Sequence, residues 1–253
     1  MLDQFGVKDC KVLSKPMAPH STKLQIIENW RGLFFYREAI GALLFLTNLT
    51  RPDVAFAVNW LACWQTKPQE LHWTMVCCIF QYLKGTSNYG LKYSVNSQAK
   101  MFGIFVDSDY RECVQTRKST TSFLTHFYGN VIQWGSKLQT TVAECSGEAE
   151  YYAICEGTPS ALFLIWLFQE TLHENPFPVD MFEDATAAIS HCTSLSSKGK
   201  LQHIELIQLK VKKYFQNGNA IKMHTHDQIV DCLTKPLPLC KFEPLCDSLV
   251  GHQ

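Results

Sequence analysis

Four acidic residues could take part in metal-assisted chemistry, because each stands at the end of an expected strand or helix. Asp107 closes the apolar run "MFGIFVD", and Asp184 closes "FPVDMFED". Glu150 and Asp231 lie in the first turns of two expected helices. If the two strands are neighbours, the four carboxylates meet at one edge of a sheet. Carboxylates packed together repel one another, and hard divalent cations such as Mg²⁺ offset that repulsion.

Such a cluster supports phosphodiester chemistry. Two Mg²⁺ ions about 4 Å apart can activate a water molecule and stabilise the leaving oxygen of a phosphodiester. Mn²⁺ suits the same oxygen ligands. Taken singly, each acid is better explained as a turn residue or as a complement to a helix dipole, so only their joint placement favours a metal site.

The stretch "RKSTT" offers groups that could contact a nucleic-acid backbone. Arg117 and Lys118 supply positive charge, and the hydroxyls of Ser119 and Thr120 can bind phosphate oxygens. The same stretch is explained equally well as the solvated start of a strand. Because 23 basic and 23 acidic residues give a formal net charge of zero, any such contact depends on local patches.

The elements that must position these groups fall into two segments. With 46% hydrophobic and 18% charged residues, the chain can bury a core. Apolar spacings of three and four predict helices over 36–64, broken at "TRPD", and over 70–85. We therefore predict a smaller, mostly helical segment over residues 1–96 and an α/β domain over residues 97–253.

The second segment is predicted to form a mixed five-stranded sheet flanked by helices. Three sequential strands, with a turn at Gly129-Asn130, should form an antiparallel meander, and later strands with helical crossovers can pair parallel to the first. Pro159 should kink or split the helix that carries Glu150. An amphipathic helix is expected to end at Gly218, and a last helix to run from Asp227 to Pro236.

Targeting signals are not evident in the sequence. The opening residues have no long apolar core, and the longest apolar run, 160–168, is too short to span a bilayer. Eleven cysteines without a CxxC pair favour reduced thiols. We expect an intracellular protein, cytoplasmic or nuclear, with no membrane partner.

Several motifs together resemble a known family. In chain order, "VDSDYRE", "RKSTTSF", "QTTVAECSGEAEYYAI", "FEDATAAI", "QHIEL" and "VDCLTKPL" resemble the ribonuclease H domain of copia-type retrotransposon Pol polyproteins. The upstream stretches "YREAIGALLFLTNLTRPDVAFAVNWLA" and "HWTMVCCIFQYLKGTSNYGLKY" resemble the end of the reverse transcriptase. The resemblance covers nearly the whole chain.

The resemblance implies a ribonuclease H-like fold that cleaves the RNA strand of RNA–DNA hybrids with Mg²⁺, as part of or derived from a polyprotein. The family's acids correspond to Asp107, Glu150, Asp184 and Asp231. Asp107 and Asp184 would hold two ions, and Glu150 would hold one and help to position the attacking water. Asp231 would complete the second ion's shell and aid product release. Expected partners are the hybrid and reverse transcriptase or other polyprotein parts.

Departures from the family pattern leave two alternatives open. No paired-Asp polymerase motif is present, and Ala185 stands where the family usually has Asn. Glu205, Ile207 and Leu209 replace the usual Asp, Arg and His. One alternative is therefore a catalytically impaired relic that binds nucleic acid or protein. The other is an interaction module built on the helices over residues 36–85.

Overall fold

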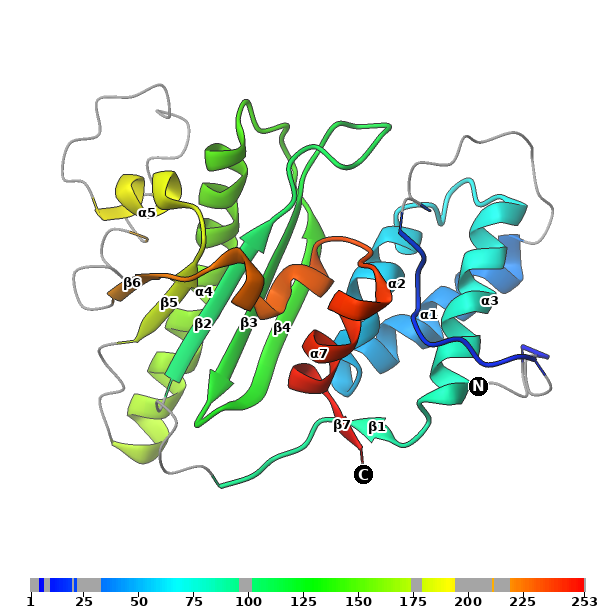
Figure 1. Cartoon of the computed structure of the whole chain (residues 1–253), viewed down its shortest axis with the longest axis horizontal. Coiled ribbons are helices and arrows are strands. Elements are labelled where there is room, and N and C mark those ends of the chain that lie inside the picture. The colour runs from blue at the N-terminus through cyan, green and yellow to red at the C-terminus, as the bar shows by residue number, and fades with distance from the viewer. Residues whose placement is uncertain are drawn as a thin grey trace. The chain divides into compact units, whose positions relative to one another are not determined.

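The computed structural model of the chain forms two compact units (Figure 1). The structure describes residues 5–6, 10–19, 21, 33–95, 102–173, 179–193, 211 and 219–252. The first unit comprises Met1–Lys92, Cys113–Gln115 and Lys235–Gln253. The second comprises Tyr93–Glu112 and Thr116–Thr234.

The first unit is built from the helices that the apolar spacing predicts. In chain order these are α1 (Leu33–Leu49), the 3₁₀ helix η2 (Pro52–Val54), α2 (Ala55–Ala62) and α3 (Glu70–Gly85). The predicted break at "TRPD" is confirmed, and its polar side chains Arg51 and Asp53 are buried. Arg51 donates from Nε and Nη2 to both carboxylate oxygens of Asp53, at 2.9 and 2.7 Å. The Tyr82 hydroxyl also donates to Asp53 Oδ2 at 2.7 Å, so α3 is tied to the break between α1 and α2.

The C-terminal segment belongs to the first unit, whereas the sequence-based division placed it with residues 97–253. This segment contains α7 (Leu239–Leu249) and β7 (Gly251–His252). β7 pairs with β1 (Tyr89–Gly90). The ring of Phe242 packs edge-on against Tyr82 of α3, and Cys246 Sγ lies 3.3 Å from the Tyr82 hydroxyl. The apolar and polar contacts of α7 with α3 account for this placement.

The second unit contains the predicted mixed sheet. Its strands are β2 (Phe102–Ser108), β3 (Thr120–Phe127), β4 (Asn130–Leu138), β5 (Asp180–Glu183) and β6 (Asn219–Lys222). They lie in the order β4-β3-β2-β5-β6. β2, β3 and β4 form the antiparallel meander, β5 runs parallel to β2, and β6 runs parallel to β5. The predicted architecture, a five-stranded mixed sheet flanked by helices, is confirmed.

Helix α4 (Ser146–Leu172) packs across β2 and β3 (Figure 1). Alternate β2 residues Phe102, Ile104 and Val106 share a buried core with Ala153 and Ile154 of α4. By length and apolar composition alone, α4 could also cross a membrane, a test that core helices of globular proteins pass as well. Packing on the sheet accounts for part of that apolar composition, while Phe163 and Trp166 of α4 are exposed.

Two helix predictions need correction. We predicted that Pro159 kinks or splits its helix; Pro159 lies inside α4, which continues as one helix, so there is no split. The last predicted helix, from Asp227 to Pro236, is instead a pair of 3₁₀ turns, η4 (Thr225–Asp227) and η5 (Ile229–Leu233). The hydrogen bond from the Thr234 N–H to the Asp231 carbonyl spans three residues, as in a 3₁₀ turn. The predicted helix ending at Gly218 lies outside the described residues, apart from Val211.

Gly157 allows α4 to approach β2 closely. A Cβ atom at this position would lie 2.7 Å from Val106 Cγ1, closer than side chains tolerate. We expect Gly157→Ala to lower the free energy of unfolding by about 1–3 kcal/mol, as overpacking does. Urea denaturation checks this. Gly147→Ala is the matched control, because its Cβ would lie an ordinary 3.4 Å from Ala187 and both changes favour helix. Equal stability of the two variants would contradict the prediction.

Candidate metal centre

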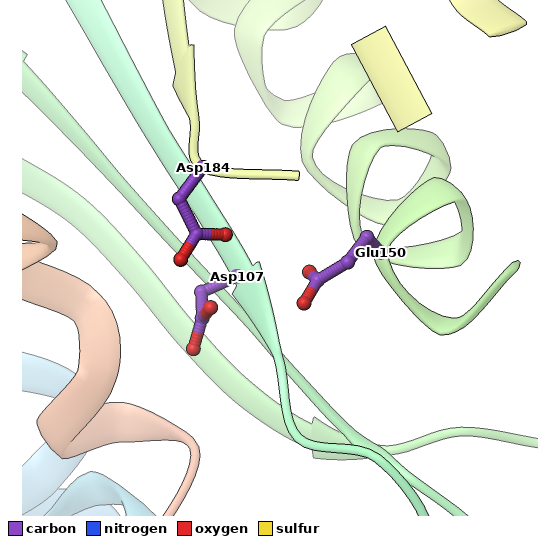
Figure 2. Close-up of side chains that lie close together, drawn as sticks. All are labelled: Asp107, Glu150 and Asp184. Carbon is purple, nitrogen blue, oxygen red and sulfur yellow. The ribbon is translucent and has the colours of Figure 1, made fainter. Parts of the chain in front are cut away.

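Three carboxylates converge at the end of β2 (Figure 2). Asp107 comes from β2, Glu150 from α4, and Asp184 directly follows β5; one oxygen from each lies within 4.8 Å of the others. The register pairs Phe105 of β2 with Phe182 of β5. Because the strands are parallel, the residues two positions further on, Asp107 and Asp184, reach the same edge of the sheet. From the sequence we predicted that four acids meet at this edge, and the structure brings Asp107, Glu150 and Asp184 together.

Glu150 carries a strongly perturbed carboxyl group. Burial raises its pKa to about 10, and the charges of Asp107, Glu183 and Asp184 add to that effect. The N–H of Ser108 donates to Glu150 Oε2 at 2.8 Å, which partly opposes the rise. The metal-free centre therefore favours a proton on Glu150 at neutral pH, and a cation can take the place of that proton.

Glu183 is an acid that the sequence analysis did not single out. It is the last residue of β5 and is 1% exposed. Burial raises its pKa to about 9, with further contributions from the charges of Asp107 and Asp184. The available signal was the pair of adjacent acids in "FED". Sequence alternation alone does not tell which of two adjacent acids at a strand end reaches a site.

Asp231 lies in η5 and is buried, but it is not one of the three acids grouped within 4.8 Å. Its segment nevertheless reaches the site. Gln228 Nε2 donates to the Val106 carbonyl at 2.8 Å. Thr234 donates its hydroxyl to Asp107 Oδ2 at 2.9 Å, across 127 positions of sequence. Within the described residues, Thr234, directly after η5, thus brings a hydroxyl to the three-acid group.

We expect Thr234→Val to lower the free energy of unfolding by about 1–3 kcal/mol, because the buried Asp107 carboxylate loses a hydrogen bond without a change in side-chain shape. Thr234 is fully buried, so water cannot easily replace the hydroxyl. Urea denaturation of the metal-free protein measures the change. Thr234→Ser keeps the hydroxyl and should retain most of the stability. A larger loss in the serine variant than in the valine variant would contradict this explanation.

The predicted backbone-contacting residues divide into two pairs. Arg117 is exposed and Lys118 is half-buried. Ser119 and Thr120 are buried. Ser119 Oγ accepts the Arg111 N–H at 3.0 Å, so this hydroxyl ties the loop together. Arg117 and Lys118 are therefore the more accessible members of the set.

The residues present fit a hard divalent cation. All three side chains of the group offer carboxylate oxygens, the ligand type that Mg²⁺ and Mn²⁺ prefer. Burial and mutual repulsion raise the pKa of Glu150, and a bound cation relieves both effects. The structure is thus compatible with divalent metal binding by Asp107, Glu150 and Asp184.

Solved structures with a similar arrangement are ribonucleases H. LC11-RNase H1, isolated from compost, has 13% sequence identity and a TM-score of 0.41, covering 53% of this chain and 93% of that chain. The RNase H1 of the halophilic archaeon Halobacterium salinarum has 10% identity and a TM-score of 0.36, covering 49% of this chain and 86% of its own. A scan against protein-family models found no match.

Curated relatives cover nearly the whole chain. The retrovirus-related Pol polyprotein from transposon TNT 1-94 of Nicotiana tabacum is 32% identical over 99% of this chain and 19% of its own length. That from transposon RE2 of Arabidopsis thaliana is 28% identical over 96% of this chain and 17% of its own length. Secreted RxLR effector protein 161 of Plasmopara viticola is 38% identical over 51% of this chain and 90% of its own length.

The chain spans about a fifth of the two polyproteins' length. Both alignments include the helical segment as well as the sheet with its acids, since they leave out at most a few per cent of the chain. A second Arabidopsis polyprotein, from transposon RE1, matches over 98% of the chain. This chain therefore belongs to the family of copia-type, retrovirus-related Pol polyproteins of transposons.

Proposed function

We propose that the second unit is a ribonuclease H module that cleaves the RNA strand of RNA–DNA hybrids with Mg²⁺. The observation that carries this proposal is the convergence of Asp107, Glu150 and Asp184 from three separate elements. Three carboxylates whose oxygens lie within 4.8 Å of one another repel, so an arrangement of this kind needs a counter-charge. Membership in the polyprotein family supports nuclease chemistry at this site.

Divalent ions at such a centre lower the pKa of a bound water and stabilise charge on the leaving oxygen. Asp107 and Asp184, side by side at the sheet edge, would hold the two proposed ions. Glu150, oriented by the Ser108 N–H, would share one ion and orient the attacking water. Asp231 is the proposed further ligand of the second ion, because it is buried in η5, and Thr234, directly after η5, donates to Asp107.

The proposed substrate contacts involve the accessible basic residues. Arg117 and Lys118 lie in the loop between β2 and β3 and can contact phosphates of the hybrid. Phosphate contacts position a nucleic acid without distinguishing RNA from DNA. Discrimination requires contact with the 2′-hydroxyl, which only the RNA strand carries.

Cleavage assays with the purified chain test this function. Labelled RNA–DNA hybrid, double-stranded RNA and double-stranded DNA are incubated with Mg²⁺, with Mn²⁺, and with a chelator. We expect cuts in the RNA strand of the hybrid alone, and none with the chelator. Absence of cleavage with both metals would overturn the proposal. Hybrid binding without cleavage would support the alternative, a catalytically impaired binding module.

A further inference from the structure

Glu183 is a buried acid whose side chain accepts hydrogen bonds from the backbone of the next two residues. Its Oε1 atom accepts the N–H of Asp184 and the N–H of Ala185, both at 3.0 Å. Its own carbonyl accepts the Met223 N–H at 3.0 Å, just past the end of β6. Glu183 is therefore held at the strand end and in turn holds the two residues after it.

These two residues form the link between β5 and α5 (Thr186–Thr193). The Ala185 carbonyl accepts the Ile189 N–H at 3.2 Å, which places Ala185 at the start of that helix. The first N–H groups of a helix lack partners within the helix, and a side-chain oxygen commonly accepts such groups. In this chain Glu183 supplies an oxygen to two N–H groups beside the helix start.

We propose that Glu183 is a positioning residue for the metal centre, which fixes the backbone of Asp184 and so the direction of the Asp184 carboxylate. Groups that hydrogen-bond metal ligands commonly set ligand orientation and affinity. The metal-binding consequence rests on the proposed function; the effect on the backbone does not. Glu183 is not one of the three grouped acids, so it acts through Asp184.

Two substitutions of Glu183 separate the role of its hydrogen-bonded oxygen from that of its second oxygen. Glu183 Oε2 is buried and makes no hydrogen bond within the described part of the chain. Glu183→Gln keeps an acceptor oxygen and the side-chain shape, and removes the carboxyl group that the charges of Asp107 and Asp184 affect. Glu183→Met has a similar length but cannot accept the two N–H groups. Comparing the two variants separates the effect of the hydrogen-bond acceptor from the effect of side-chain size.

Amide hydrogen exchange in the metal-free, full-length protein gives the first readout. We expect the Asp184 and Ala185 amides to be protected in the wild type and in Glu183→Gln, and to exchange at least about tenfold faster in Glu183→Met. Unprotected amides in the wild type, or unchanged protection in Glu183→Met, would overturn the proposal. If Glu183→Met does not fold, Glu183→Asp replaces it, because its carboxylate is withdrawn by one methylene.

Mn²⁺ affinity, measured by paramagnetic resonance, gives the second readout. We expect about 10–100-fold weaker binding in Glu183→Met and near wild-type binding in Glu183→Gln. Equal loss in both variants would overturn the positioning role, since charge rather than the acceptor would then matter. The control is Glu156→Met, at an exposed α4 residue that pairs with Lys137. If the wild type binds no Mn²⁺, the proposed function fails, and the exchange measurement still decides the role of Glu183.

Discussion

Asp107→Asn and Asp184→Asn should each lower Mg²⁺-dependent cleavage of an RNA–DNA hybrid by about a thousandfold or more. Each change keeps the side-chain shape but removes a negative charge from the group of three carboxylates. A neutral amide is a weaker ligand for a hard cation than a carboxylate. Single-turnover cleavage at saturating enzyme measures the rate and separates the chemical step from hybrid binding.

Asp109→Asn is the matched control for these variants. Asp109 is another buried acid on the same chain segment, 5% exposed, but it is not one of the three grouped acids. Its Oδ1 atom accepts the Glu112 N–H at 3.2 Å, a bond that an asparagine oxygen can also accept. We expect cleavage within about threefold of the wild type, since the substitution leaves the three carboxylates unchanged. Unchanged cleavage in an Asp107→Asn/Asp184→Asn double variant would exclude these acids from the chemistry.

The sheet and two of its acids were predictable because local rules determine them. A helical crossover lets the following strand run parallel to an earlier strand of the same sheet, so β5, which follows α4, could be expected to pair in parallel with β2. Acids at the carboxyl ends of such neighbours meet at one edge. The position of Glu150 was predictable in a similar way. The apolar residues of α4 pack on the sheet, and Glu150 lies near the start of that helix.

Features that depend on long-range packing were not predictable in the same way. The contact between Thr234 and Asp107 joins residues 127 positions apart, and no local period encodes it. The packing of α7 on Tyr82 likewise decides which unit holds the C-terminal segment. Pro159 removes one backbone donor, yet α4 continues, because tertiary packing against β2 and β3 can outweigh a single lost helix bond.

The metal-free protein should lose stability as the pH rises from about 5 to about 9. Burial raises the pKa of Glu150 to about 10 and that of Glu183 to about 9, above their ordinary value of 4.5. Between those limits the native state holds protons that the unfolded state has released. Each such proton makes the free energy of unfolding fall as the pH rises. The stabilising contribution is therefore complete below the unfolded pKa and lost as the pH approaches the folded values.

Urea denaturation at several pH values, with a chelator or with Mg²⁺, measures this dependence. Glu150→Gln removes one of the two groups, so its slope in the chelator should be shallower than that of the wild type. A ligand that binds only the native state stabilises it increasingly as its affinity rises, and carboxylates bind cations best when deprotonated. Mg²⁺ should therefore stabilise the protein more at high pH than at low pH, and oppose the loss seen with the chelator. Stability that is independent of pH in the chelator, or a Mg²⁺ effect that shrinks as the pH rises, would show that these carboxyl groups are not held protonated in place of a cation.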